Sequence, residues 1–211
     1  MRTLPSFVFE KPLWEKQFTV IGIDEVGRGA FAGPVGVGGV IFDPNLTTSD
    51  KNYLLSLGID DSKKLSSSKR KSLASIIKEN VTGYAVELVD VSVIDDIGIG
   101  KATFIGMKKI AEKLSKKTNN PYLLIDAFEI PDAMFPQHGI IRGDSLSISI
   151  AAASILAKVE RDMVMEQLAS KFKNYGWENN KGYGTLKHRK AIAEFGVTKF
   201  HRKEFCRNFT A

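Results

Sequence analysis

Two adjacent carboxylates, Asp24 and Glu25, stand between an apolar run and a glycine-rich stretch. Carboxylate oxygens are hard ligands that suit Mg²⁺ or Mn²⁺, so the pair has the chemistry of half a metal site. Gly27 and Gly29 permit a tight turn and a close backbone approach to a ligand, because glycine carries no Cβ. Arg28 between them offers planar donors to a phosphate or a carboxylate. An ordinary strand end with solvated acids and an arginine salt bridge would give the same pattern.

Two further acids follow apolar segments later in the chain. Asp126 directly ends the run Tyr122–Ile125, and Asp144 comes just after a predicted strand at 139–141. A site with few carboxylates leaves coordination positions for water and substrate phosphate oxygens, which indicates phosphoryl-ester chemistry. Two ions can then activate a water and stabilise the leaving oxygen without a nucleophilic side chain. Four unrelated structural acids remain the alternative, because the chain has 24 Asp and Glu residues.

The elements that must position these acids follow from hydrophobic periodicity. The β-branched residues of 19–23 favour a buried strand that ends at the first two acids. Successive strand side chains point to opposite faces, so Asp24 and Glu25 converge only where that strand twists, bulges or stops. Strands are predicted at 19–23, 35–42, 84–91, 122–125 and 139–141, and helices at 67–78, 101–117 and 145–173. The last 41 residues have the pattern of short helices and loops.

Composition bounds the class of protein. A chain of 211 residues with 43% apolar residues can bury one core, so a single domain over 1–211 is predicted, with 174–211 as its basic C-terminal helical extension. No apolar run is long enough to cross a bilayer. The single cysteine, Cys206, excludes an intrachain disulfide framework and fits a cytoplasmic location. No oligomerisation signal is present, and we expect a monomer.

The net charge of +6 is concentrated in one region, since residues 171–211 hold ten Lys and Arg against three acidic residues. These cations alternate with aromatic residues, a combination that suits a polyanion with bases. The aromatics would equally suit the core of a helical subdomain, and we assign most of the phenylalanines there. The basic tail is thus a candidate phosphate-binding surface.

Several segments carry motifs in a fixed order. They are IDEVGRG (23–29), AGPV (32–35), DSKKL (61–65), LID (124–126), GDS (143–145) leading into an alanine-rich helix with Arg161-Asp162, and GYGT (182–185) with His188. Together they resemble ribonuclease HII, the type 2 ribonuclease H family, over roughly residues 18 to 190. The resemblance implies an α/β ribonuclease H-like fold, with a mixed central sheet flanked by helices and the acids along one edge.

The resemblance also implies roles for individual residues. Asp24, Glu25, Asp126 and Asp144 would be the catalytic carboxylates that bind metal. Gly27, Arg28, Gly29 and Tyr183 would recognise the ribonucleotide and its junction with DNA, since telling RNA from DNA requires close contact with the 2′-hydroxyl. Lys63 and Lys64, with the basic tail, would hold phosphates. His188 would be structural or a phosphate contact, and Arg161-Asp162 is expected to be a helix-surface salt bridge.

The activity implied is that of a Mg²⁺- or Mn²⁺-dependent endonuclease. It would hydrolyse the RNA strand of RNA–DNA hybrids and cut at ribonucleotides embedded in duplex DNA, leaving 3′-hydroxyl and 5′-phosphate ends. Its partners would be those two nucleic acids, and no protein partner is predicted, because the C-terminal residues 207–211 show no clear docking motif.

Three other classes of protein share part of this pattern. Type 3 ribonucleases H have the same sheet and acids, but they lack the Gly-Arg-Gly arrangement and carry an extra N-terminal domain. In receiver-type signalling domains the acids lie closer in sequence than Asp24 and Asp126 do here. A nucleic-acid-binding module that has lost catalysis would be expected to replace one of the four acids, and all four are present.

Overall fold

A computed structural model describes residues 4–209 of the chain, so five terminal residues of the predicted 1–211 domain lie outside it. The strands are β1 (Thr19–Val26), β2 (Val35–Ile41), β3 (Gly83–Val89), β4 (Pro121–Asp126) and β5 (Gln137–Ile140). They form one mixed sheet in the order β3-β2-β1-β4-β5. β1 pairs antiparallel with β2 and parallel with β4. β3 is antiparallel to β2, and β5 is parallel to β4. The predicted mixed-sheet fold is confirmed.

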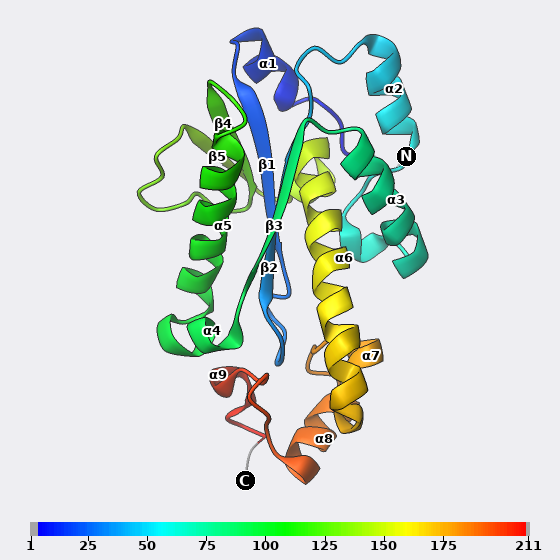
Figure 1. The fold of residues 1–211 in the computed structure, drawn as a ribbon, viewed down its shortest axis with the longest axis vertical. Coiled ribbons are helices and arrows are strands. Elements are labelled where there is room, and N and C mark those ends of the chain that lie inside the picture. The colour runs from blue at the N-terminus through cyan, green and yellow to red at the C-terminus, as the bar shows by residue number, and fades with distance from the viewer. Residues whose placement is uncertain (1–3, 210–211) are drawn as a thin grey trace.

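Helices flank this sheet on both faces (Figure 1). The α-helices are α1 (Glu10–Glu15), α2 (Thr48–Ser56), α3 (Ser67–Glu79), α4 (Val91–Ile97), α5 (Ile99–Ser115), α6 (Ile148–Lys171), α7 (Trp177–Asn180), α8 (Leu186–Phe195) and α9 (Lys203–Cys206). Three short 3₁₀ turns are η1 (Ser62–Lys64), η2 (Gly143–Ser145) and η3 (Lys173–Tyr175). None of the described helices is long and apolar enough to cross a membrane.

The glycines of β2 show why α5 and α6 lie on opposite faces. A Cβ on Gly38 would stand 2.2 Å from the carbonyl oxygen of Ala153 in α6. A Cβ on the next residue, Gly39, would stand 2.3 Å from Ile110 in α5. Successive strand residues face opposite sides, so these two glycines admit one helix on each face. The long helix α6 therefore packs directly on the sheet backbone.

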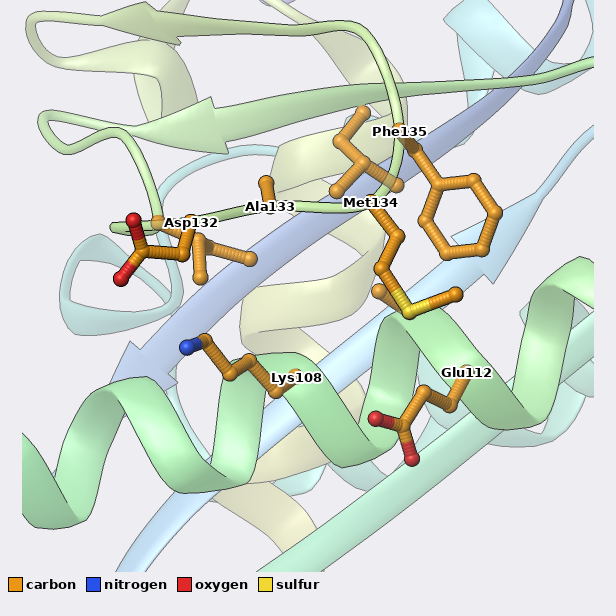
Figure 2. A pocket seen from close by; sticks show the side chains of 9 residues that line it. Lys108, Glu112, Asp132, Ala133, Met134 and Phe135 are labelled. Carbon is orange, nitrogen blue, oxygen red and sulfur yellow. The ribbon is translucent and has the colours of Figure 1, made fainter.

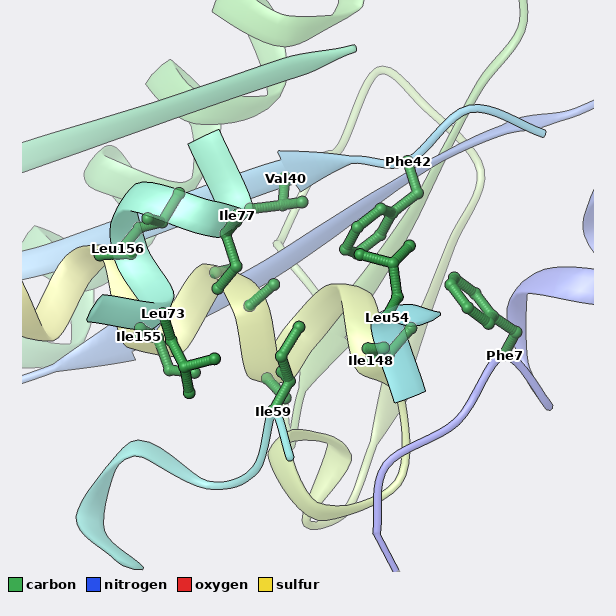
Figure 3. Packing of buried hydrophobic residues seen from close by; sticks show 14 residues of the cluster. Phe7, Val40, Phe42, Leu54, Ile59, Leu73, Ile77, Ile148, Ile155 and Leu156 are labelled. Atoms are coloured by element: carbon green, nitrogen blue, oxygen red, sulfur yellow. The ribbon is translucent and has the colours of Figure 1, made fainter. Parts of the chain in front are cut away.

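Apolar side chains fill the space on either side of the sheet. On one face, Phe7, Phe42 and Leu73 pack with the buried face of α6 (Figure 3). On the other face, Met107 and Ile110 of α5 pack against strand residues. The helix predicted at 101–117 thus corresponds to α5, and it buries Thr103, Met107, Ile110 and Leu114 along one face.

Several predicted boundaries were wrong. β1 runs on to Val26, so the first two acids lie inside the strand and not at its end. β3 ends at Val89, and Val91 begins α4. The helix predicted from residue 145 begins at Ile148, because 143–145 form the turn η2 and the side chain of Ser147 caps the first turn of α6.

Candidate active site

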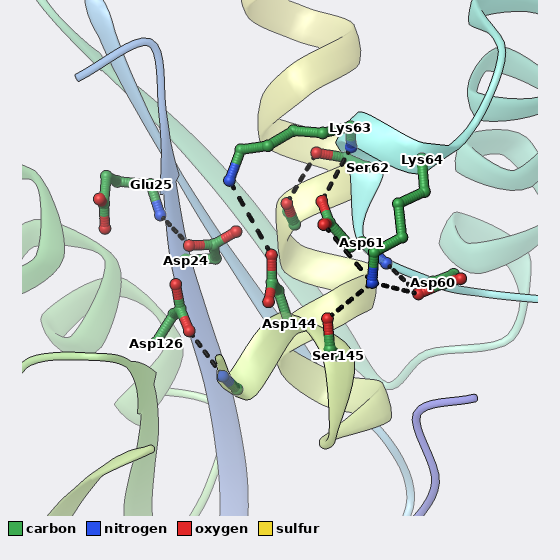
Figure 4. A network of polar contacts seen from close by, with 12 residues as sticks. Asp24, Glu25, Asp60, Asp61, Ser62, Lys63, Lys64, Asp126, Asp144 and Ser145 are labelled. Atoms are coloured by element: carbon green, nitrogen blue, oxygen red, sulfur yellow. Dashed lines mark hydrogen bonds and ion pairs between the residues drawn. The ribbon is translucent and has the colours of Figure 1, made fainter. Parts of the chain in front are cut away.

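The pairing of β1 with β4 brings three of the predicted acids to one place. Ile23 pairs with Ile125 in parallel register, so Asp24 and Asp126 follow that pair on neighbouring strands. Asp24 and Glu25 leave β1 on opposite sides (Figure 4). The backbone N–H of Glu25 donates to Asp24 Oδ1 at 2.7 Å. Asp24 and Glu25 thus lie on opposite sides of β1, and the charge of Asp126 acts on both of them.

Asp144 reaches the same edge from η2, the turn before α6. The backbone N–H of Gly143 donates to Asp126 Oδ1 at 2.6 Å, which ties the turn to the end of β4. A Cβ on Gly143 would meet Ile150 at 2.6 Å, so the residue before Asp144 has to be small. Asp144 itself is 6% exposed, against 2% for Asp24. The structure brings all four predicted carboxylates together at this edge.

Burial and mutual repulsion dominate the electrostatics of this cluster. Burial raises the pKa of Asp24 well above its usual value, and the charges of Glu25, Asp126 and Asp144 raise it further. The pKa of Glu25 is raised by burial, with Arg28 opposing the rise, and Glu25 Oε2 is buried without a hydrogen bond. Burial also raises the pKa values of Asp126 and Asp144. The site is therefore short of positive charge.

The loop at 60–64 supplies part of that charge. Lys63 Nζ lies 4.0 Å from Asp144 Oδ2, and 71% of its side chain is exposed. Burial alone would lower the pKa of Lys63, but Asp24, Asp61, Asp144 and Asp126 together raise it. Lys64 Nζ donates to Ser145 Oγ at 2.9 Å and lies 3.5 Å from Asp60 Oδ1 (Figure 4). Lys63 thus faces the acids, and Lys64 ties the loop to η2.

The donor set has the chemistry that a hard divalent ion requires. It consists of carboxylate oxygens that repel one another, one of them a buried oxygen without a partner. Within residues 4–209, however, no three His, Cys, Asp or Glu side chains are already gathered closely enough to enclose an ion. Mg²⁺ is ordinarily held by one or two carboxylates and completed by water and substrate phosphates, so this open arrangement fits it.

Beside the acids lies a hollow of about 480 Å³, here called the nucleotide pocket. Its walls are Glu25, Val26, Gly27, Arg28, Gly29, Ser62, Lys63, Arg70, Lys158 and Tyr183. A β-bridge between Ala30 and Tyr183 brings the predicted tyrosine next to the Gly-Arg-Gly turn from 150 residues away. Arg28 lies 3.9 Å from Glu25 and places its guanidinium 4.4 Å from the centre of the Phe128 ring. One predicted carboxylate, the residues predicted to recognise the ribonucleotide and the predicted phosphate ligand Lys63 therefore meet in this pocket.

His188 does not line the pocket. It is fully buried, with its Nδ1 3.0 Å from the carbonyl oxygen of Tyr183 and its Nε2 accepting from Trp177 Nε1 at 3.0 Å. Burial lowers its pKa. The prediction of a phosphate contact is therefore corrected to the structural alternative, because a fully buried ring presents no atom to a substrate.

Two arginines also differ from expectation. Arg161 is fully buried and not on a helix surface, and its guanidinium donates to the carbonyl oxygens of Ala32, Pro34 and Lys181. Arg202, counted in the basic tail, is equally buried, and burial and the charge of Arg161 lower its pKa to about 9. Neither side chain can bind a phosphate, because both are buried and donate to backbone carbonyls. Trp177 and Tyr175 of the tail are buried too, as the core alternative predicted.

Two other hollows differ in their relation to the acids. One of about 420 Å³ lies across the acids from the nucleotide pocket and is lined by Asp126, Asp144, Arg142 and Lys64, among others. The other, of about 210 Å³, lies between α5 and residues 130–135, where Lys108 extends toward Asp132 and Glu112 lies near Met134 (Figure 2). None of the four carboxylates lines this second hollow, so we do not assign it a role in the chemistry of the acids.

Some pocket residues carried too weak a signal to be assigned from the sequence. Asp61 stands in the DSKKL motif and acts electrostatically on Asp126 and Asp144. Lys158 bonds Asp162 at 2.8 Å and lies 5.5 Å from the centre of the Tyr183 ring. Lysines are common on helices, and only the packing of α6 beside Tyr183 shows that this one faces the pocket.

Comparisons with known proteins agree with this geometry. The family model described as Ribonuclease HII matches residues 21–208. Ribonuclease HII of Clostridioides difficile is 44% identical over 202 residues, which are 95% of this chain and 75% of that protein. The structure titled the PCNA:RNase HII complex from Archaeoglobus fulgidus contains a chain with TM-score 0.72 and 27% identity, covering 91% of this chain and 97% of that one. Bst-RNase HIII in complex with Mn²⁺ shares the fold, with TM-score 0.73 and 22% identity over 91% of this chain and 69% of that one.

The sheet order, the flanking helices and the acids at one edge place the protein in the class of ribonuclease H-type folds. Within this class the match is specific. The chain belongs to the ribonuclease HII family. Family membership implies a nuclease, a hydrolase that acts on phosphodiester bonds.

Proposed function

We propose that this chain is a Mg²⁺- or Mn²⁺-dependent endonuclease that hydrolyses the RNA strand of RNA–DNA hybrids. It also cuts at ribonucleotides embedded in duplex DNA, leaves 3′-hydroxyl and 5′-phosphate ends, and works as a monomer in the cytoplasm. The observation that carries the proposal is the meeting of four carboxylates, from three separate segments, beside a pocket walled by glycines, cations and a tyrosine.

Asp24, Glu25, Asp126 and Asp144 would hold two ions. Ions held there would supply the charge that activates a water and stabilises the leaving oxygen of an in-line displacement. The chain's own residues prepare that step, because the crowded acids supply negative charge and Lys63 remains protonated beside them. The neighbour Bst-RNase HIII was solved with Mn²⁺, which supports this choice of ion.

The nucleotide pocket would select the ribonucleotide. The backbone of Gly27, Arg28 and Gly29 lines the pocket, and an added Cβ at Gly29 would meet nothing within 4 Å, so a sugar can come close to this turn. The half-buried ring of Tyr183 forms the facing wall and would place the neighbouring sugar. Lys63 and Lys64 would hold the phosphates on either side without reading sequence.

An end-labelled DNA duplex with a single ribonucleotide tests this proposal. The protein is incubated with it in Mg²⁺, in Mn²⁺ or in chelator, alongside an all-DNA duplex of the same sequence. We expect one nick at the ribonucleotide, only with an ion present, and a product that a polymerase extends without prior phosphatase treatment. Binding without any ion-dependent nick would instead identify a nucleic-acid-binding module.

A further inference from the structure

The segment Thr198–Arg202, a loop between α8 and α9, touches both walls of the nucleotide pocket without lining it. Gly33 donates its N–H to the carbonyl oxygen of Phe200 at 2.8 Å, and Arg202 donates its N–H to the carbonyl oxygen of Phe31 at 2.8 Å. A β-bridge joins Ala32 to His201. The C-terminal loop therefore runs alongside the residues that follow the Gly-Arg-Gly turn.

Arg202 holds the first wall. Its Nη1 donates to the carbonyl oxygen of Arg28 at 2.9 Å, and its Nε and Nη2 donate to that of Gly33 at 3.0 and 2.9 Å. The side chain is fully buried, and these three bonds all go to backbone carbonyls at the two ends of residues 28–33. The planar fork of a guanidinium can hold two carbonyls at a fixed separation, which a lysine ammonium cannot.

His201 holds the second wall through His188. The indole of Trp177 can only donate, so His188 Nε2 is an acceptor and its Nδ1–H donates to the carbonyl oxygen of Tyr183. His201 Nε2 lies 3.1 Å from that same nitrogen. Because the Nδ1 of His201 accepts from the N–H of Thr198 at 2.9 Å, its Nε2–H shares the single lone pair of His188 Nε2 with the indole N–H. The two rings form a directed chain that ends on Tyr183.

We infer that His201 and Arg202 are positioning residues that, together with the direct bridge between Ala30 and Tyr183, fix the distance between the Gly-Arg-Gly turn and Tyr183, and with it the selection of a ribonucleotide. The inference deepens the proposed function and rests on it for the ligand. Two neighbouring residues of one loop each fix the backbone carbonyl of a different wall, so the loop couples walls that are far apart in the sequence. A misplacement of about 1 Å can lower a rate a hundredfold, which makes such coupling effective.

The contacts that His201 and Arg202 make with the two walls are here called the clasp. Hydrogen exchange of the folded protein tests the clasp without reference to activity. Asn at position 201 can accept from Thr198 but is too short to reach His188, whereas Gln carries an amide N–H close to the place of Nε2. We expect H201N, but not H201Q, to speed exchange at 182–188 at least tenfold. R202K should speed exchange at 27–34 at least tenfold. Lys113→Gln, an exposed change on α5, serves as the control.

Equal exchange at 182–188 in H201N and H201Q would overturn the role of His201. Protection lost to the same extent in β1 and β4 as in the two walls would overturn the clasp in favour of general destabilisation. R202K with normal protection at 27–34 would remove Arg202 from it.

A double-mutant cycle connects the clasp to selection. On the duplex with one ribonucleotide, we expect H201N to lower kcat/KM at least fivefold in the wild-type background and less than twofold in a Tyr183→Ala background. Equal losses in both backgrounds would show that His201 does not act through Tyr183. Should the wild-type protein fail to nick at all, the proposed function falls, while hydrogen exchange still decides whether the clasp exists.

Discussion

The buried carboxylates of the site lower the stability of the folded protein. Asp24 is almost fully buried beside three other carboxylates, so the folded state disfavours its charged form. A group whose pKa rises on folding lowers stability at a pH above its folded pKa value, because ionisation is easier in the unfolded chain. The cost is relieved when a cation arrives, and this links metal affinity to the crowding itself.

Asp24→Asn should therefore raise the free energy of unfolding in chelator at pH 7, because it removes a buried charge that three neighbouring carboxylates disfavour. Asparagine keeps an oxygen for the N–H of Glu25 and loses the charge. Urea unfolding followed by circular dichroism gives the value. A variant clearly less stable than the wild type would show that Asp24 is not under electrostatic stress.

At the scale of elements, most of the fold could be predicted from the sequence. Alternation and β-branched residues located the strands, including the glycine-rich strand β2, whose glycines admit the helices on both faces. α1, α2 and α4 were missed, because each is short and the apolar stripe of α2 is weak. The burial of Arg161 and Arg202 was also out of reach, since their partners are backbone carbonyls, which leave no trace in residue types.

Gly38→Ala tests the packing of α6 on the sheet. The added Cβ would stand 2.2 Å from a backbone oxygen of Ala153, and backbone cannot swing aside as a side chain can. We expect the free energy of unfolding to fall by about 2 kcal/mol or more. A loss below about 0.5 kcal/mol would mean that α6 does not lie directly on β2.

Gly29→Ala is the matched change in the pocket. Nothing stands within 4 Å of the added Cβ, so stability should stay the same or rise by up to about 1 kcal/mol. Cutting at a single ribonucleotide should nevertheless fall at least tenfold, because the methyl group enters the space proposed for the sugar. Full activity in this variant would remove the turn from ribonucleotide recognition.

At the scale of the whole molecule, the C-terminal portion 174–211 forms part of the body over its described residues. Phe172, Trp177 and Phe200 pack with Ala32 and Met165 in one cluster, so the tail is anchored on α6 and on the turn after β1. Lys187 and Lys190 of the tail are exposed, and a phosphate role for them stays a prediction. The tail is thus both support and candidate binding surface.

This anchoring should be sensitive to acid. Burial and the neighbouring His188 lower the pKa of His201 from 6.5 to about 4, so the folded state favours its neutral form. The stability it contributes is complete above pH 6.5 and is lost as the pH falls toward 4. Urea unfolding at pH 7 and pH 5 should show a fall in stability that is about 2 kcal/mol larger for the wild type than for His201→Gln. Equal falls would show that His201 does not titrate in this way.

The proposed chemistry is ion-dependent cleavage at a ribonucleotide by the four carboxylates. Single-turnover cleavage of a DNA duplex with one ribonucleotide tests it, with wild-type protein and the folded variants Asp24→Asn, Glu25→Gln, Asp126→Asn and Asp144→Asn measured side by side in Mg²⁺ and in Mn²⁺. We expect rapid nicking by the wild type, none in chelator, and rates at least a hundredfold lower in each variant. Cleavage that persists in chelator, or a wild-type rate in Asp24→Asn or Asp126→Asn, would contradict the account.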